Sequence, residues 1–68
     1  MAKLPSSNKI IKTLLNNGFL LVSQRGSHAK YKKGSRTVIV PSPKKEIPSG
    51  TFRSIIRQSG LTENDFKF

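Results

Sequence analysis

The apolar residues at the start of the chain follow a helical period. Ser6 or Ser7 can cap the beginning of a helix, and Gly18, which follows two asparagines, is a typical helix end. The residues that share one face of this helix are Ile10, Ile11, Leu14 and Leu15. The pattern predicts a first helix between the serine pair and Gly18.

From Phe19 onward the period changes to that of β-strands. The β-type runs span residues 19–25, 28–33 and 37–40. The pairs Gly26-Ser27 and Gly34-Ser35 separate them, and each pair suits a two-residue type II′ turn with glycine at the position that needs a positive φ. The pattern predicts a three-stranded antiparallel meander.

These two turns also predict the register of the sheet, because directly opposed residues share a face. The expected pairs are Arg25–His28, Ser23–Lys30, Val22–Tyr31, Tyr31–Val38, Ala29–Val40 and Lys30–Ile39. One face is expected to be apolar and to hold Leu20, Val22, Ala29, Tyr31, Val38 and Val40. The other is expected to hold Ser23, Arg25, His28, Lys30, Lys32 and Thr37, with the apolar residues Phe19, Leu21 and Ile39 also on it.

A proline-rich loop and a second helical pattern complete the chain. The loop contains Lys44-Lys45, and the following helix is expected over residues 50–59 with Gly60 as its end. Its apolar stripe and flanks are Ile47, Phe52, Ile55, Ile56 and Leu61. Residues 62–65 resemble the start of one more turn. The element order predicts a single domain over residues 1–68, with an α+β, two-layer α-β-β-β-α architecture in which both helices cover one face of the sheet.

Charge narrows the class of partner. The 68 residues carry a net charge of +10, and ten of the thirteen basic residues precede the first acid, Glu46. Such a field attracts a polyanion, so nucleic acid or an acidic protein is expected, and a membrane is not. No apolar run has the length of a signal peptide or a membrane span, which predicts a soluble, cytoplasmic protein. The chain has no cysteine.

His28 is the only histidine and the candidate for proton transfer. The acids Glu46, Glu63 and Asp65 are too few and too late in the chain for a two-carboxylate hydrolase or a metal cage. RNA cleavage needs a base for the 2′-hydroxyl and cations near the phosphate, so an imidazole flanked by Arg25, Lys30 and Lys32 would suffice without a metal. The alternative is a surface histidine without a catalytic role.

Other side chains are weaker candidates for a functional role. Tyr31 can stack a base, but the register turns it inward, which favours a core role. Ser27 is not expected to act as a nucleophile, because no third residue is present to orient His28. The Gly26-Ser27 turn is enough to explain a serine at this position. A group near the start of the second helix is a candidate phosphate site, with a solvated cluster as the alternative. Its members are Lys44, Lys45, Arg53 and Arg57.

Several stretches together resemble one family. They are Gly18-Phe19, RGSHAKY at 25–31, TVIVP at 37–41 and KEIPSGTFRSIIRQSGL at 45–61. In this order and spacing they resemble the HicA family of toxin mRNA interferases over about residues 7–62. The resemblance implies a fold like the double-stranded-RNA-binding domain, ribosome-independent mRNA cleavage without a cofactor, and a catalytic His28. It also implies a HicB-type antitoxin that covers the His28 face, and contact with DNA only through that antitoxin.

Two departures from the family accompany this resemblance. Many relatives have a second histidine where this chain has Ser42-Pro43, and the Gly34-Ser35 turn is shorter than usual. Two other interpretations stay open. One is a module of the same fold that binds duplex RNA without cleaving it, and the other is an inert remnant that only binds an antitoxin.

Overall fold

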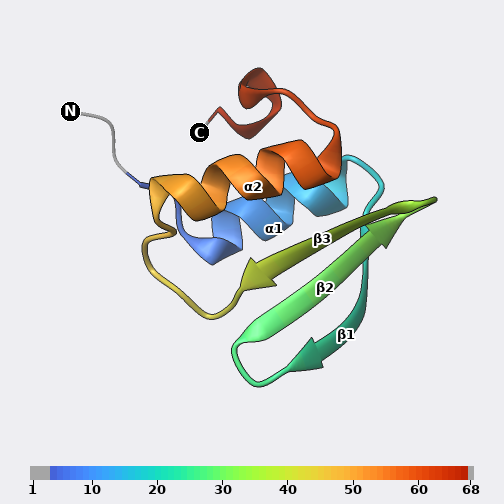
Figure 1. Cartoon of the computed structure of the whole chain (residues 1–68), viewed down its shortest axis with the longest axis horizontal. Coiled ribbons are helices and arrows are strands. Elements are labelled where there is room, and N and C mark those ends of the chain that lie inside the picture. The colour runs from blue at the N-terminus through green and yellow to red at the C-terminus, as the bar shows by residue number, and fades with distance from the viewer. Residues whose placement is uncertain (1–3, 68) are drawn as a thin grey trace.

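The helices and strands follow the predicted order. A computed structural model describes residues 4–67. Its elements are α1 (Ser7–Asn16), β1 (Leu20–Arg25), β2 (His28–Lys33), β3 (Arg36–Pro41), α2 (Ser49–Ser59) and a 3₁₀ turn, η1 (Glu63–Phe66). Figure 1 shows the three strands below the two helices, with η1 packed above them. The α+β prediction is confirmed.

Both hairpin turns have the predicted geometry. The strands form one antiparallel sheet in the order β1-β2-β3. Gly26 and Gly34 have φ values of +55° and +59°, and among residues 4–67 positive φ occurs only at glycine. A positive φ at the first turn residue alone is the signature of a type II′ turn. The predicted pairs Arg25–His28, Ser23–Lys30, Tyr31–Val38, Ala29–Val40 and Lys30–Ile39 are all present.

The first half of β1 departs from the predicted register. The pairing shifts between Leu21 and Ser23, so that Leu21 rather than Val22 lies opposite Tyr31. This bulge accommodates one extra residue, Val22, on β1. Leu20, which was expected on the apolar face, lies opposite Lys32 instead, and the side chains of Leu20 and Val22 are 67% and 50% exposed.

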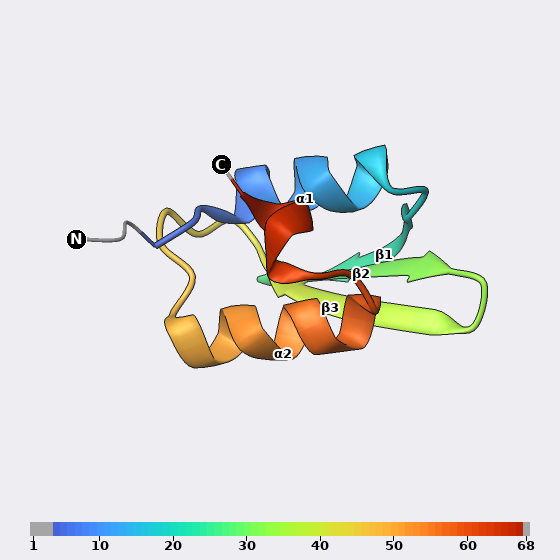
Figure 2. The same ribbon diagram turned by 90° about the horizontal axis from the view of Figure 1, so that it is seen from above.

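Two helices cover one face of the sheet, and they do so unevenly. Figure 2 shows α1 and α2 along opposite margins of the view, with the strands visible between them, and both helices contact β3. The buried apolar residues between the layers are Ile10, Leu14, Phe19, Ala29, Tyr31, Val38, Val40, Ile47, Ile55 and Phe66. Since β1 is the strand furthest from β3 in the sheet, its inner face lies beyond this cover, which explains why all six residues of β1 are exposed.

Phe19 belongs to the core and not to the polar face on which the sequence pattern put it. It is fully buried and precedes the first residue of β1. Its backbone N–H donates to the Leu14 carbonyl across the end of α1 (3.0 Å), where Gly18 adopts a φ of +90°. This turn, which glycine accommodates without strain, directs the Phe19 ring under the helices.

The start of α1 and the end of α2 are capped as the sequence predicts. The Ser6 hydroxyl accepts the Lys9 N–H at the start of α1 (3.3 Å), and Gly60 ends α2 in the left-handed conformation. At η1, Asp65 and Thr62 form a reciprocal capping box. Phe66 is buried there and meets the Phe52 ring edge to face, with ring centroids 5.6 Å apart.

Candidate functional site

A depression on the outer face of the sheet contains the only histidine. It has a volume of about 450 Å³, and its lining residues are Ser23, Arg25, His28, Lys30 and Ile39. The strand register explains this grouping, because Arg25 lies opposite His28, and Ser23, Lys30 and Ile39 form a row across the three strands. The helices lie on the other face of the sheet, so the depression is open to solvent.

His28 is held at the mouth of the first hairpin. It is the first residue of β2 and is paired with Arg25 on β1 and Pro41 on β3. Just beyond β3, the Ser42 N–H donates to the Ser27 carbonyl (2.7 Å) and ties the end of β3 to the turn. The backbone around His28 is therefore bonded on both sides, while its side chain is exposed.

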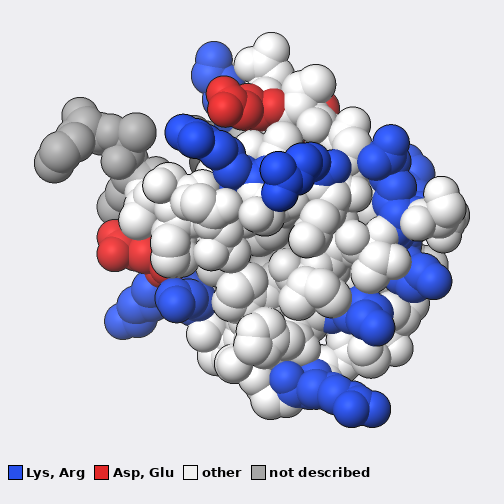
Figure 3. Space-filling model, viewed as in Figure 1, with Lys and Arg blue, Asp and Glu red and all other residues white. Residues whose placement is uncertain are grey.

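Cations surround the imidazole. Arg25 and Lys30 line the same depression, and Lys32 lies two residues further along β2 on the same face. The first acid in the chain is Glu46, so none of the three strands carries a carboxylate. In Figure 3, Lys and Arg atoms lie over the sheet and α2, while acidic atoms occupy small areas away from the strands. The outer face of the sheet is therefore an anion-attracting surface.

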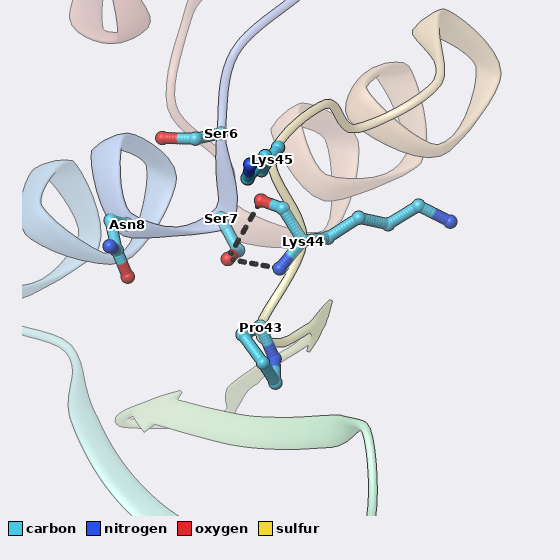
Figure 4. Close-up of a pocket in the computed structure, with 6 residues that line it drawn as sticks. All are labelled: Ser6, Ser7, Asn8, Pro43, Lys44 and Lys45. Carbon is cyan, nitrogen blue, oxygen red and sulfur yellow. Dashed lines mark hydrogen bonds between the residues drawn. The ribbon is translucent and has the colours of Figure 1, made fainter.

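Lys44 and Lys45 lie beside the start of α1. Together with Ser6, Ser7, Asn8 and Pro43 they line a second pocket, of about 350 Å³. Figure 4 shows the buried Ser7 hydroxyl bridging the Lys44 backbone: it accepts from the Lys44 N–H (3.0 Å) and donates to the Lys44 carbonyl (3.2 Å). The Ser7 N–H donates to the same carbonyl (2.9 Å). These bonds fix the path of the lysine loop, while both lysine side chains stay exposed.

The two arginines of the expected cluster lie on α2, and their grouping with Lys44 and Lys45 stays a prediction. Arg53 lies in the first half of α2, and Arg57 lies in its last turn. Both are exposed, on the helical layer that covers the inner face of the sheet. The predicted cations thus come from three parts of the fold: the outer sheet face, the loop that contacts α1, and α2.

Tyr31 has the core role that the register predicted. It is 5% exposed, and its burial raises the pKa of the phenol above its usual value of 10.0. Ser23 and Ile39, in contrast, line the depression without having been singled out as site residues. The cross-strand pairing with Lys30 was the signal that would have placed them beside His28, because opposed residues share a face.

This set of groups supports proton transfer next to a bound anion. An imidazole can give or take a proton near neutral pH, and the adjacent guanidinium and ammonium groups can stabilise negative charge on a phosphate. In residues 4–67 no three His, Cys, Asp or Glu side chains are grouped so as to bind a metal ion.

Comparison with protein families finds one family whose model matches most of the chain. Residues 7–61 match the family described as the HicA toxin of bacterial toxin–antitoxin. The chain belongs to the HicA toxin family. It is accordingly the toxin of a toxin–antitoxin system, which implies an antitoxin partner. No curated protein matches this HicA chain closely. None of the helices formed by residues 4–67 has the length and apolar character needed to cross a membrane.

Proposed function

We propose that this HicA chain is an endoribonuclease that cleaves mRNA independently of the ribosome and thereby inhibits translation and growth. The observation that carries the proposal is the exposed His28 in a depression lined by Arg25 and Lys30. A protein that only held RNA by charge would not need an imidazole at this position. Family membership supports the toxin role.

His28 acts on the internal nucleophile of RNA. It takes the proton of a 2′-hydroxyl, whose oxygen attacks the adjacent phosphorus while the bond to the 5′-oxygen of the next nucleotide breaks. The departing oxygen takes up a proton, from the imidazolium or from water. The products are a 2′,3′-cyclic phosphate and a 5′-hydroxyl end. Arg25 and Lys30 stabilise the charge that develops on the phosphate oxygens, and no metal ion is required.

The remaining cations hold the RNA chain on either side of the scissile bond. Lys32 extends the positive outer face along β2. In the other direction, the chain beyond Pro41, which lies opposite His28, leads to the loop of Lys44 and Lys45. The backbone of the bound RNA follows both of these directions from His28. Arg53 and Arg57 contact a longer RNA that reaches α2. A HicB-type antitoxin covering the His28 face would block the substrate directly.

The deciding experiment compares wild-type protein with His28→Ala and His28→Gln on a defined mRNA in EDTA. Loss of the general base should slow cleavage by at least about 100-fold. Both variants should keep the wild-type thermal stability, because His28 is exposed, and should still bind the RNA. The fragments should end in cyclic phosphate.

A charge variant provides the matched control. Lys32→Ala should retain cleavage at saturating protein, while the slope of log affinity against log salt should fall by about one unit or slightly less. Cleavage by His28→Ala at the wild-type rate would refute the assignment of His28. Intact RNA that all variants bind in a salt-sensitive manner would instead identify a binding module.

A further inference from the structure

The edge strand β1 exposes an apolar segment that nothing in the cleavage mechanism uses. Leu20, Leu21 and Val22 are 67%, 50% and 50% exposed, although they are consecutive residues of a strand. β1 pairs with β2 on one side only, and the helices contact β3. A run of large apolar side chains on an open sheet edge is a feature that soluble proteins usually avoid unless a partner covers it.

The opposite edge of the same sheet is protected. The outward N–H of Ile39 on β3 donates to the side-chain oxygen of Gln58 on α2 (3.2 Å). This bond occupies a backbone donor that an added strand would need. The two edges of the sheet therefore differ: β3 is blocked by a helix residue, and β1 is open.

The hairpin geometry identifies a free backbone group on β1. In a two-residue hairpin the closing pair, here Arg25 and His28, exchanges both of its hydrogen bonds. The next pair, Gln24 and Ala29, is then a non-hydrogen-bonded pair, so the N–H and C=O of Gln24 point away from β2. These groups are directed at the position of a fourth strand.

We propose that β1 binds an extended, acidic segment of a partner protein, which adds to the sheet as a fourth strand. Main-chain bonds at Gln24 would supply affinity, and alternate side chains of the segment would supply specificity. Apolar residues of the segment would cover Leu21 and Val22, and its acidic residues would lie beside Arg25 on the outer face. The proposal rests on membership in a toxin–antitoxin family and is independent of RNA cleavage.

Charge favours an acidic partner over a second copy of this chain. Two copies would bring net charges of +10 together, and the cations Arg25, Lys30 and Lys32 share the outer face with Leu20. Like charges at an interface cost affinity, whereas complementary charges raise the association rate and select the partner.

The test uses a short end-blocked peptide that alternates glutamate with valine, and a counterpart with lysine in place of glutamate. Binding to the full chain is followed by NMR through backbone amide shifts. Gln24→Pro removes the outward N–H, and Gln24→Ala keeps it. Proline is tolerated on an edge strand when its nitrogen faces away from the neighbouring strand, so both variants should fold. Leu20→Glu, a change at a highly exposed side chain, places a negative charge on the same edge without altering the backbone.

We expect the acidic peptide to shift the amides of β1 and to bind the Gln24→Ala variant as it binds wild type. Gln24→Pro and Leu20→Glu should each weaken its binding by about tenfold, the equivalent of about 1.4 kcal/mol. The lysine peptide should bind wild type more weakly than the acidic one does.

Several results would overturn the proposal. They are the absence of binding at millimolar peptide, equal binding by Gln24→Pro and Gln24→Ala, and equal binding of the two peptides. A concentration-dependent dimer of the chain alone that Gln24→Pro dissociates would assign the edge to a second copy. Because no RNA is present, none of these outcomes bears on the role of His28.

Discussion

The hydrogen bonds between Ser7 and the Lys44 loop allow the effect of Ser7→Ala on folding stability to be predicted quantitatively. Ser7 is 1% exposed, and its hydroxyl both accepts from and donates to the Lys44 backbone, 37 residues away in the sequence. Ser7→Ala removes both hydrogen bonds and leaves the Lys44 N–H without its acceptor. The bond from the Ser7 N–H to the Lys44 carbonyl is unaffected, so the change isolates the contribution of the hydroxyl.

Leaving a buried polar group unsatisfied costs about 1–3 kcal/mol. A chain of 68 residues is expected to have a total stability of about 3–10 kcal/mol, so this loss is a large fraction of it. For a domain of this size each kcal/mol lowers the melting temperature by about 4–8 °C. We therefore expect Ser7→Ala to melt about 4–24 °C below wild type.

The assay is urea and thermal unfolding followed by circular dichroism, with Ser35→Ala as the matched control. Ser35 is an exposed residue of the second hairpin turn, and such surface changes shift stability by no more than about 0.5 kcal/mol. If Ser7→Ala and Ser35→Ala had the same unfolding free energy, then the hydroxyl bridge would not hold the loop, and the reasoning would be refuted.

Two further predictions concern the C-terminal part of the chain. Gly60 has a φ of +71°, so Gly60→Ala should lower the unfolding free energy by about 1–2 kcal/mol, and an unchanged melting temperature would contradict this. Hydrogen bonds from the Thr62 N–H and hydroxyl lower the pKa of Asp65 below its usual 3.8. A lowered carboxyl pKa stabilises the fold above the unfolded pKa, and this stability is lost as the pH falls through the folded pKa. Wild type should thus exceed Asp65→Asn in unfolding free energy at neutral pH, with a gap that narrows on acidification; a constant gap would contradict the role of the carboxylate.

The elements and most of the register could be predicted because local chemistry determines them. Both Gly-Ser turns require a glycine at positive φ, and each turn fixes the pairs next to it, so the row of Ser23, Lys30 and Ile39 follows from the sequence. The depression around His28 is a direct consequence of that row. The family match spans the residues of the motif that contains the histidine.

The start of β1 could not be predicted in the same way. Leu20, Leu21 and Val22 are all apolar, so shifting the register by one residue leaves the pattern of apolar positions unchanged, and the bulge produces no break in alternation. Whether a helix covers a given strand depends on tertiary packing, which a local sequence pattern does not determine. For the same reason the contact of the lysine loop with α1, which depends on long-range bonds from Ser7, could not be predicted.

The hydrogen bond between Gln58 and Ile39 also affects how further chains can add to the edges of the sheet. Cross-β growth requires two free edges on each molecule, since every added chain must offer a new template to the next. Because the outward Ile39 N–H of β3 is bonded to Gln58, the β3 edge is a poorer template for a further strand than the β1 edge. A fibre that grew through this sheet would have to break the bond between Gln58 and Ile39 at every addition, and this cost opposes growth from the exposed Leu-Leu-Val run.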